Sequence, residues 1–145
     1  APPSPAPARF TARFRPKLVR NAEDMLRLVE APAEQILDAR STGRFAGTAP
    51  EPRAGLRSGH MPGARNLPYD RLLNEDGTLK DAEALRALFA EAGIDLDRPV
   101  VTSCGSGVSA TVPLLALLRL GHRAGALYDG SWAEWGSRQD TPIVT

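Results

Sequence analysis

The sequence VTSCGSGVSATVPLLALL, residues 101–118, joins two apolar runs through a turn that contains two glycines. The first run has the character of a buried strand, and the second predicts an apolar helix over residues 108–120 that ends at Gly121. Pro113 is compatible with this helix because it lies near the first turn. A strand, a tight turn and a helix in this order indicate a β-to-α unit. The only cysteine of the chain, Cys104, ends its strand.

Strands and helices alternate along most of the chain. The other expected elements are, in chain order, a helix capped by Asn21 with Ala22, Met25, Leu26 and Val29 on its apolar face, a buried strand in EQILDAR (34–40), a Gly/Pro-rich excursion from Arg40 to Pro68, an amphipathic helix from Asp81 to Gly93, and a strand in GALYDG (125–130). This alternation indicates an α/β fold with a central parallel sheet flanked by helices on both faces. Ligands in such sheets bind at the carboxyl ends of the strands.

Composition limits the classes of function. A chain of 145 residues with 42% hydrophobic content can bury the core of one domain. One cysteine excludes an internal disulfide, a cysteine-based zinc site and a C-x-x-C redox pair, and we expect neither metal nor cofactor. The net charge is +1 and the arginines are scattered, which argues against a nucleic-acid surface. No apolar stretch has the length of a membrane span and no secretory leader is evident, so we expect a soluble, cytoplasmic protein.

The first residues differ in character from the rest. The segment APPSPAPARF (1–10) contains four prolines and has no apolar periodicity. It predicts an extended linker or arm over residues 1–20, followed by a catalytic domain over residues 21–145. The chain begins without methionine, which suggests processing or a missing upstream part.

The residues after Cys104 are suited to an anion-binding loop. Gly105, Ser106 and Gly107 permit a tight arc whose backbone N–H groups point inward, followed by a helix N-terminus. Each hydrogen bond to a charged sulfur contributes about 1.5–3 kcal/mol, and one pKa unit corresponds to about 1.4 kcal/mol. Two such bonds would make Cys104 a thiolate at neutral pH. The alternative is a core cysteine followed by an ordinary β-to-α turn.

Spacing argues against two other classes of cysteine enzyme. Cysteine phosphatases require an arginine six residues after the nucleophile to bind the phosphate oxygens, and Ala110 occupies that position. A protease-like pair requires a histidine within reach. His60 lies in a turn-like segment and His122 just past a helix end, and both positions favour structural or exposed histidines. The remaining chemistry is a thiolate that attacks a sulfane sulfur and carries it as a persulfide.

Three segments resemble the catalytic C-terminal domain of the rhodanese-like sulfurtransferases, most closely the 3-mercaptopyruvate sulfurtransferase type. They are ILDARSTGRFAGTAPEPRAGLRSGHMPGARNLPYDRLL (36–73), SCGSGVSA (103–110) and YDGSWAEWG (128–136), and the likeness spans residues 21–145. The resemblance implies a parallel α/β domain of the rhodanese type. It also implies transfer of sulfur from a donor, through a cysteine persulfide, to a thiol or cyanide.

The resemblance assigns roles within the cysteine loop. It places the persulfide on Cys104 and the cradle on Gly105, Ser106, Gly107, Val108 and Ser109. Ser109 stands where threonine is commoner, and it keeps the hydroxyl group. In the thiosulfate-preferring branch the two residues after the cysteine are typically basic, whereas the Gly105-Ser106 pair is similar to the mercaptopyruvate branch.

Arginines outside the loop also acquire roles. Arg44 and Arg53 match the family positions that hold the anionic oxygens of the donor, and a guanidinium fork binds a planar carboxylate through two parallel hydrogen bonds. Arg40 is expected to pair with a buried carboxylate instead. Trp132 and Trp135 fit a packed helical turn that closes the wall of the site.

We therefore expect a sulfurtransferase with mercaptopyruvate as its favoured donor and thiosulfate as its second. The acceptor would be a thiol such as thioredoxin, a low-molecular-weight thiol or cyanide. Two alternatives stay open, namely a thiosulfate-specific rhodanese and a non-catalytic rhodanese-fold module that binds a partner protein. The resemblance further implies an upstream non-catalytic rhodanese domain, in the same polypeptide or as a separate chain. In the family, a histidine and an aspartate of that domain are proposed to act in a relay with the serine matched by Ser106.

Overall fold

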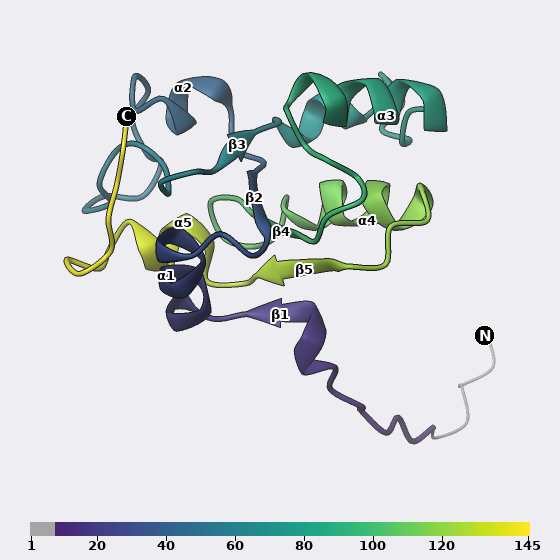
Figure 1. Cartoon of the computed structure of the whole chain (residues 1–145), viewed down its shortest axis with the longest axis horizontal. Coiled ribbons are helices and arrows are strands. Elements are labelled where there is room, and N and C mark those ends of the chain that lie inside the picture. Colours follow the sequence, from purple (N-terminus) through teal and green to yellow (C-terminus); the bar gives the residue numbers. More distant parts are fainter. Residues whose placement is uncertain (1–7) are drawn as a thin grey trace, which may run out of the picture.

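Parallel strands form the centre of the structure, a computed structural model that describes residues 8–145 (Figure 1). The elements in chain order are η1 (Pro16–Leu18), β1 (Val19–Arg20), α1 (Ala22–Glu30), β2 (Gln35–Asp38), α2 (Thr42–Phe45), β3 (Arg65–Asn66), η2 (Tyr69–Leu72), α3 (Ala82–Glu91), β4 (Val100–Ser103), α4 (Thr111–Arg119), β5 (Gly125–Tyr128) and α5 (Ser131–Trp135). Within the described residues the sheet has five strands in the order β1-β5-β4-β2-β3, all parallel. The α/β class expected from the sequence is confirmed.

The register of the sheet gathers the strand ends that matter for function. Strand β4 is central and pairs with β2 on one side, where Ser103 lies opposite Asp38. On its other side β4 pairs with β5 up to Thr102, which lies opposite Leu127. Since all these strands are parallel, the residues that follow Asp38, Ser103 and Tyr128 emerge at the same edge of the sheet.

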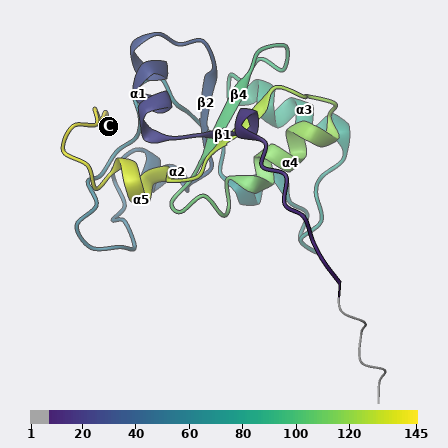
Figure 2. The ribbon, with the colours of Figure 1, turned by 90° about the horizontal axis from the view of Figure 1, so that it is seen from below.

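Apolar side chains alternate between the two faces of the sheet and form a core on each. Ile36, Val101 and Ala126 face α1 and α5, and their neighbours Leu37 and Val100 face α3 and α4. Figure 2 shows α1 and α5 on one side of the strands and α3 and α4 on the other. Burying both faces stabilises a parallel sheet, and the expectation of helices on both faces is confirmed.

The capping residues expected from the sequence begin two of the helices. The side chain of Asn21 accepts a hydrogen bond from the backbone N–H of Asp24, and the Asp24 carboxylate accepts from the N–H of Asn21, which forms a complete capping box at α1. Asp81 caps α3 by accepting from the N–H of Ala84. Gly93 follows α3 with a φ of 74°, a conformation that glycine adopts without strain.

The helix after Cys104 is shorter than the sequence predicts. It was expected over residues 108–120, but α4 begins at Thr111. Residues 105–110 instead form turns around the cysteine, with Gly107 at a φ of 84°. Gly107 precedes the expected helix, and its left-handed backbone ends the arc around Cys104. Residues 108–110 form a bend and a turn before α4, in which the N–H of Thr111 donates to the carbonyl oxygen of Val108 (3.1 Å).

The N-terminal segment also departs from expectation. Residues 1–7 of the predicted linker lie outside the described part of the chain, and residues 8–15 are exposed without regular structure. Val19 and Arg20, however, form β1 and pair with Leu127 and Tyr128 of β5. Two residues are too few for an apolar pattern, so only the pairing reveals that the sheet begins before the expected boundary at Asn21.

Candidate active site

Cys104 lies at the carboxyl end of β4 and is 1% exposed. The start of α5 anchors the backbone on both sides of the sulfur. The N–H of Trp132 donates to the carbonyl oxygen of Cys104 (2.9 Å), and the N–H of Ala133 donates to that of Gly105 (2.8 Å). The hydroxyl of Ser131 accepts from the N–H of Cys104 (3.0 Å). These bonds hold the Cys104 backbone in one orientation relative to its loop.

The loop favours the ionised form of the thiol. Burial raises the pKa of Cys104, but the Ser109 hydroxyl and the backbone N–H groups of Ser106, Ala110 and Gly107 donate hydrogen bonds to the sulfur and together bring this pKa below its ordinary value. Of the arc expected from the sequence, Ser106 and Gly107 contribute their amides and Ser109 its hydroxyl. Ala110 is an additional donor, and Gly105 and Val108 are not among the donors. Because the thiolate is the nucleophilic form of cysteine, a lowered pKa favours reaction at Cys104.

Two glycines of the loop allow close approaches that a side chain would block. At Gly107, an added Cβ would lie 2.6 Å from the carbonyl oxygen of Asp129, and the φ of 84° disfavours other residues as well. At Gly105, an added Cβ would lie 2.7 Å from Nη2 of Arg44. The absence of a side chain at position 105 thus lets a guanidinium group reach the loop that carries Cys104.

A pocket of about 250 Å³ opens beside the loop. It is lined by Arg44, Glu51, Pro52, Arg53, Leu56, Gly105, Ser106 and Ser109. Five of the expected site residues thus come together here. Gly107 does not line the pocket, and its N–H donates to the Cys104 sulfur. Val108 does not line the pocket, and the residue is 73% exposed. The turn that directs neighbouring amides at the sulfur points the Val108 side chain outward.

Arg44 reaches the pocket as part of a chain of buried charges. Its Nη2 donates to Oε2 of Glu51 (2.6 Å), and its Nε donates to Oε1 (3.2 Å). The same Oε1 accepts from Nη1 of Arg40 (2.8 Å), whose Nη2 also donates to Oδ2 of Asp38 (2.7 Å). The side chains of Arg40, Glu51 and Asp38 are at most 2% exposed. The expectation that Arg40 pairs with a buried carboxylate is confirmed, with two such partners.

Arg53 differs from Arg44 in its surroundings. It is exposed at the mouth of the same pocket, and within residues 8–145 it forms no ion pair. The two arginines thus contribute one anchored and one exposed guanidinium group to a small cavity beside the Cys104 loop. Such an arrangement suits a small anion that carries the sulfur to be attacked.

Ser131 is a residue of this site that the sequence did not indicate. It is completely buried and adopts a φ of 50°, the one positive φ at a non-glycine position in the described chain. Its hydroxyl donates to the carbonyl oxygen of Tyr128 (2.9 Å) while accepting from Cys104. A left-handed serine carries strain, which the surrounding hydrogen bonds offset. The GSW sequence one residue after the end of β5 is the only local signal of this corner.

The aromatic residues of α5 pack as expected. Trp132 and Trp135 are fully buried, and their indole N–H groups donate to the carbonyl oxygens of Arg57 and Pro142. The guanidinium carbon of Arg40 lies 4.1 Å from the centroid of the Trp132 ring. The predicted packed helical turn is thereby confirmed. The Trp132 ring covers Arg40, which donates a hydrogen bond to Glu51.

Neither histidine approaches the sulfur as a base would. The ring of His60 stacks on Phe45, with centroids 3.7 Å apart, and its Nδ1 lies 2.8 Å from the Phe45 carbonyl oxygen. Nε2 of His122 lies 2.9 Å from the carbonyl oxygen of Arg98. Both histidines therefore have the structural contacts that the sequence favoured, and a Cys–His pair is not formed.

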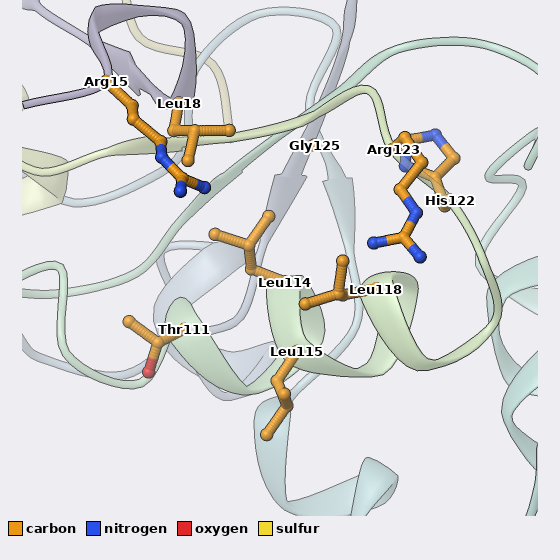
Figure 3. A pocket seen from close by; sticks show the side chains of 9 residues that line it. All are labelled: Arg15, Leu18, Thr111, Leu114, Leu115, Leu118, His122, Arg123 and Gly125. Carbon is orange, nitrogen blue, oxygen red and sulfur yellow. The ribbon is translucent and has the colours of Figure 1, made fainter.

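A larger cavity, of about 510 Å³, lies between α4, the start of β5 and the segment that carries Arg15 and Leu18 (Figure 3). Leu114, Leu115 and Leu118 form its apolar floor, and Arg15 and Arg123 stand at its rim. It shares no lining residue with the pocket beside the Cys104 loop. The larger cavity contains neither a nucleophile nor an amide cradle. The smaller pocket beside Cys104 is therefore the better candidate for chemistry.

Comparison with known proteins agrees with this geometry. The model of the rhodanese-like domain family matches residues 21–138, which include the whole sheet except β1 and all of the cysteine loop. The chain belongs to the rhodanese-like domain family. Within the described part of this rhodanese-like domain, no helix is long and apolar enough to cross a membrane.

Similar proteins occur in bacteria, plants and fungi. The chain is 46% identical over 134 residues to the 3-mercaptopyruvate sulfurtransferase of Escherichia coli K12, which covers 92% of the chain and 47% of the relative. It is 44% identical over 138 residues to the mitochondrial thiosulfate/3-mercaptopyruvate sulfurtransferase 1 of Arabidopsis thaliana, and this match covers 95% of the chain and 36% of the relative. The crystal structure of Tum1 from Saccharomyces cerevisiae superposes with a TM-score of 0.76 at 42% identity, covering 84% and 44%. This rhodanese-like domain therefore spans less than half the length of these relatives.

Proposed function

We propose that the chain is a sulfurtransferase that moves a sulfane sulfur from 3-mercaptopyruvate, or from thiosulfate as second donor, through a persulfide on Cys104. The observation that carries this proposal is the cradle, because hydrogen bonds to the sulfur lower the pKa of a thiol that burial alone would raise. The names of the relatives support both donors. The neutral Gly105-Ser106 pair favours mercaptopyruvate over thiosulfate.

Persulfide formation follows from the chemistry of a thiolate beside an anion pocket. The Cys104 thiolate attacks the sulfur of mercaptopyruvate and forms a new S–S bond while the C–S bond of the donor breaks. The electron pair of that bond leaves as the enolate of pyruvate, which takes up a proton. With thiosulfate, the S–S bond of the donor breaks and sulfite leaves. The cradle amides that stabilise the thiolate also stabilise the negative charge of the persulfide.

The pocket residues have separate tasks in this proposal. Arg44 and Arg53 bind the carboxylate or the sulfonate-like oxygens of the donor, while Gly105, Gly107 and Val108 contribute the backbone of the cradle. Ser109 donates its hydroxyl to the sulfur. Ser106, which is exposed at the pocket, assists departure of the enolate.

An acceptor thiol, such as thioredoxin or a low-molecular-weight thiol, completes the cycle. Its thiolate attacks the outer sulfur of the persulfide, the Cys104 S–S bond breaks, and the Cys104 thiolate is regenerated. Cyanide takes the same sulfur and leaves as thiocyanate. The compartment in which this occurs is proposed to be the cytoplasm, although the Arabidopsis relative is named mitochondrial.

The mass of the intact chain tests the proposal directly. Exposure to mercaptopyruvate or thiosulfate should add the mass of one sulfur atom, and cyanide or dithiothreitol should remove it. Because the chain has one cysteine, the added mass can be assigned to Cys104. An unchanged mass with both donors would support the alternative of a non-catalytic binding module instead. A gain from thiosulfate alone would support the thiosulfate-specific alternative.

A companion domain is the second part of the proposal, and relatives more than twice as long as the matched segment support it. We expect the chain alone to accept sulfur, because the cradle and both arginines are local, but to turn mercaptopyruvate over slowly. Adding an upstream rhodanese domain, fused or as a separate chain, should raise kcat more than it lowers KM, since it would supply the proton-transfer partners of Ser106. Steady-state kinetics with and without that domain measure this. A full-rate isolated chain that does not respond to the domain would contradict it.

A further inference from the structure

A carboxylate lines the pocket proposed for an anionic donor. Glu51 is the one acidic residue among the described residues that line this pocket, and its side chain is 2% exposed. A negative charge at such a position repels an anion that enters the pocket. Its presence therefore affects which anions the pocket accepts.

The charge of Glu51 acts mainly on Arg44. Arg40 already has Asp38 as a partner at 2.7 Å and is completely buried, so its charge is offset within the core. Glu51 binds Arg44 at 2.6 Å through its other oxygen. Among these groups, two carboxylates face three guanidinium groups, and the exposed Arg53 supplies the remaining positive charge.

The same contact fixes the geometry of Arg44. Glu51 engages both Nε and Nη2, and Nη2 approaches the backbone of Gly105 so closely that a Cβ there would lie 2.7 Å away. The guanidinium group is thereby held against the Cys104 loop with much of its charge offset. It can still donate to a ligand, but it attracts charge less strongly than a free arginine.

The two donors of the proposed function differ in charge. Mercaptopyruvate carries one negative charge at neutral pH, because its thiol is protonated, while thiosulfate carries two. The Coulomb attraction between donor and pocket is proportional to the charge on each. Each positive charge added to the pocket thus favours the dianion over the monoanion, and each offset charge does the reverse.

We propose that Glu51 contributes to donor preference: by offsetting the charge of Arg44 it keeps the positive charge of the pocket low and favours a monoanionic α-keto acid over a dianionic sulfur donor. This inference rests on the proposed function and adds a buried carboxylate to the neutral Gly105-Ser106 pair as a feature that selects between its two donors. Glu51 acts through Arg44 and through the field in the pocket, so it is a specificity-determining residue and takes no part in bond breaking.

The test compares the two donors on one protein. Glu51→Gln removes the charge while keeping the volume and an oxygen acceptor, and the ratio of second-order rate constants for persulfide formation, thiosulfate over mercaptopyruvate, should rise about tenfold. A ratio is independent of the fraction of active protein. Glu51→Asp, which keeps the charge, should retain the wild-type ratio even if both rates fall. Glu91→Gln, an exposed carboxylate on α3, is the matched control and should change nothing.

Two outcomes would overturn this inference. The first is an equal decrease in the rate constant of persulfide formation with both donors in Glu51→Gln, which would assign Glu51 a purely structural role. The second comes from the wild-type chain and needs no variant to fold. Pyruvate and sulfate should protect Cys104 from iodoacetamide with dissociation constants within about threefold of each other. Much stronger protection by sulfate would show that Glu51 does not offset the charge of Arg44. A wild type that gains sulfur from neither donor would overturn the proposed function, while this protection experiment would still test Glu51.

Discussion

Replacing Cys104 with serine is expected to abolish sulfur transfer completely. The hydroxyl of serine stays protonated at neutral pH even in a cradle that stabilises anions, and the chain contains no other thiol to take over. The variant should therefore gain no sulfur mass from either donor and show no turnover. Serine is close to cysteine in size, so the fold should persist, which circular dichroism can verify. Transfer at the wild-type rate would contradict the persulfide mechanism.

A relocated thiol provides the control for that experiment. Ser137 is exposed after α5, outside the loop that surrounds Cys104. The double variant Cys104→Ser/Ser137→Cys has one cysteine, as the wild type does, but no cradle around it. It should react with iodoacetamide and yet form no persulfide at a catalytic rate. Sulfur transfer by this variant would mean that any accessible thiol suffices and that the loop has no catalytic role.

Removing either arginine of the pocket is expected to produce the second largest loss of activity. Arg44→Ala and Arg53→Ala should each lower kcat/KM for mercaptopyruvate by about 10- to 150-fold, which corresponds to about 1.5–3 kcal/mol for a charge-assisted hydrogen bond. The effect at Arg53 should lie at the lower end, because this side chain is exposed and solvent screens its charge. Steady-state kinetics of pyruvate release measure both.

Alkylation by a neutral reagent separates donor binding from maintenance of the thiolate. The rate at which iodoacetamide modifies Cys104 should change little in either arginine variant, because the cradle hydrogen bonds come from residues 106–110. Arg86→Ala, on the exposed side of α3, is the matched control and should retain full activity. Equal losses in alkylation and in turnover would indicate that the arginines support the loop or the fold and do not bind the donor.

Local patterns in the sequence were sufficient for the α/β class and for the position of Cys104 at the end of a strand. Capping at Asn21 and Asp81 and the apolar runs around residues 100–103 are determined by neighbouring residues, and they appear in the structure where they were expected. The same holds for Cys104 at a strand end before a glycine turn. A parallel strand places its last residue at the ligand-binding edge whatever the rest of the chain does.

Other features depend on contacts between distant residues and could not be predicted. Strand β1 has two residues and exists because Val19 and Arg20 pair with β5, over a hundred positions away in sequence. The first three residues of the expected helix, 108–110, form a bend and a turn before Thr111, and the N–H of Ala110 donates to the Cys104 sulfur. The outward direction of Val108 follows from the same turn.

The sequence alone determined which groups are available for chemistry, since residue types and short spacings decide whether a thiol, a hydroxyl or a guanidinium group is present. The tertiary structure decided how those groups are charged and oriented. Ser131 supports the Cys104 backbone from the end of a different strand, and Glu51 connects Arg40 in the core to Arg44 in the pocket. Electrostatic energies depend on distance and burial, and both are set by the folded arrangement and not by separation along the chain.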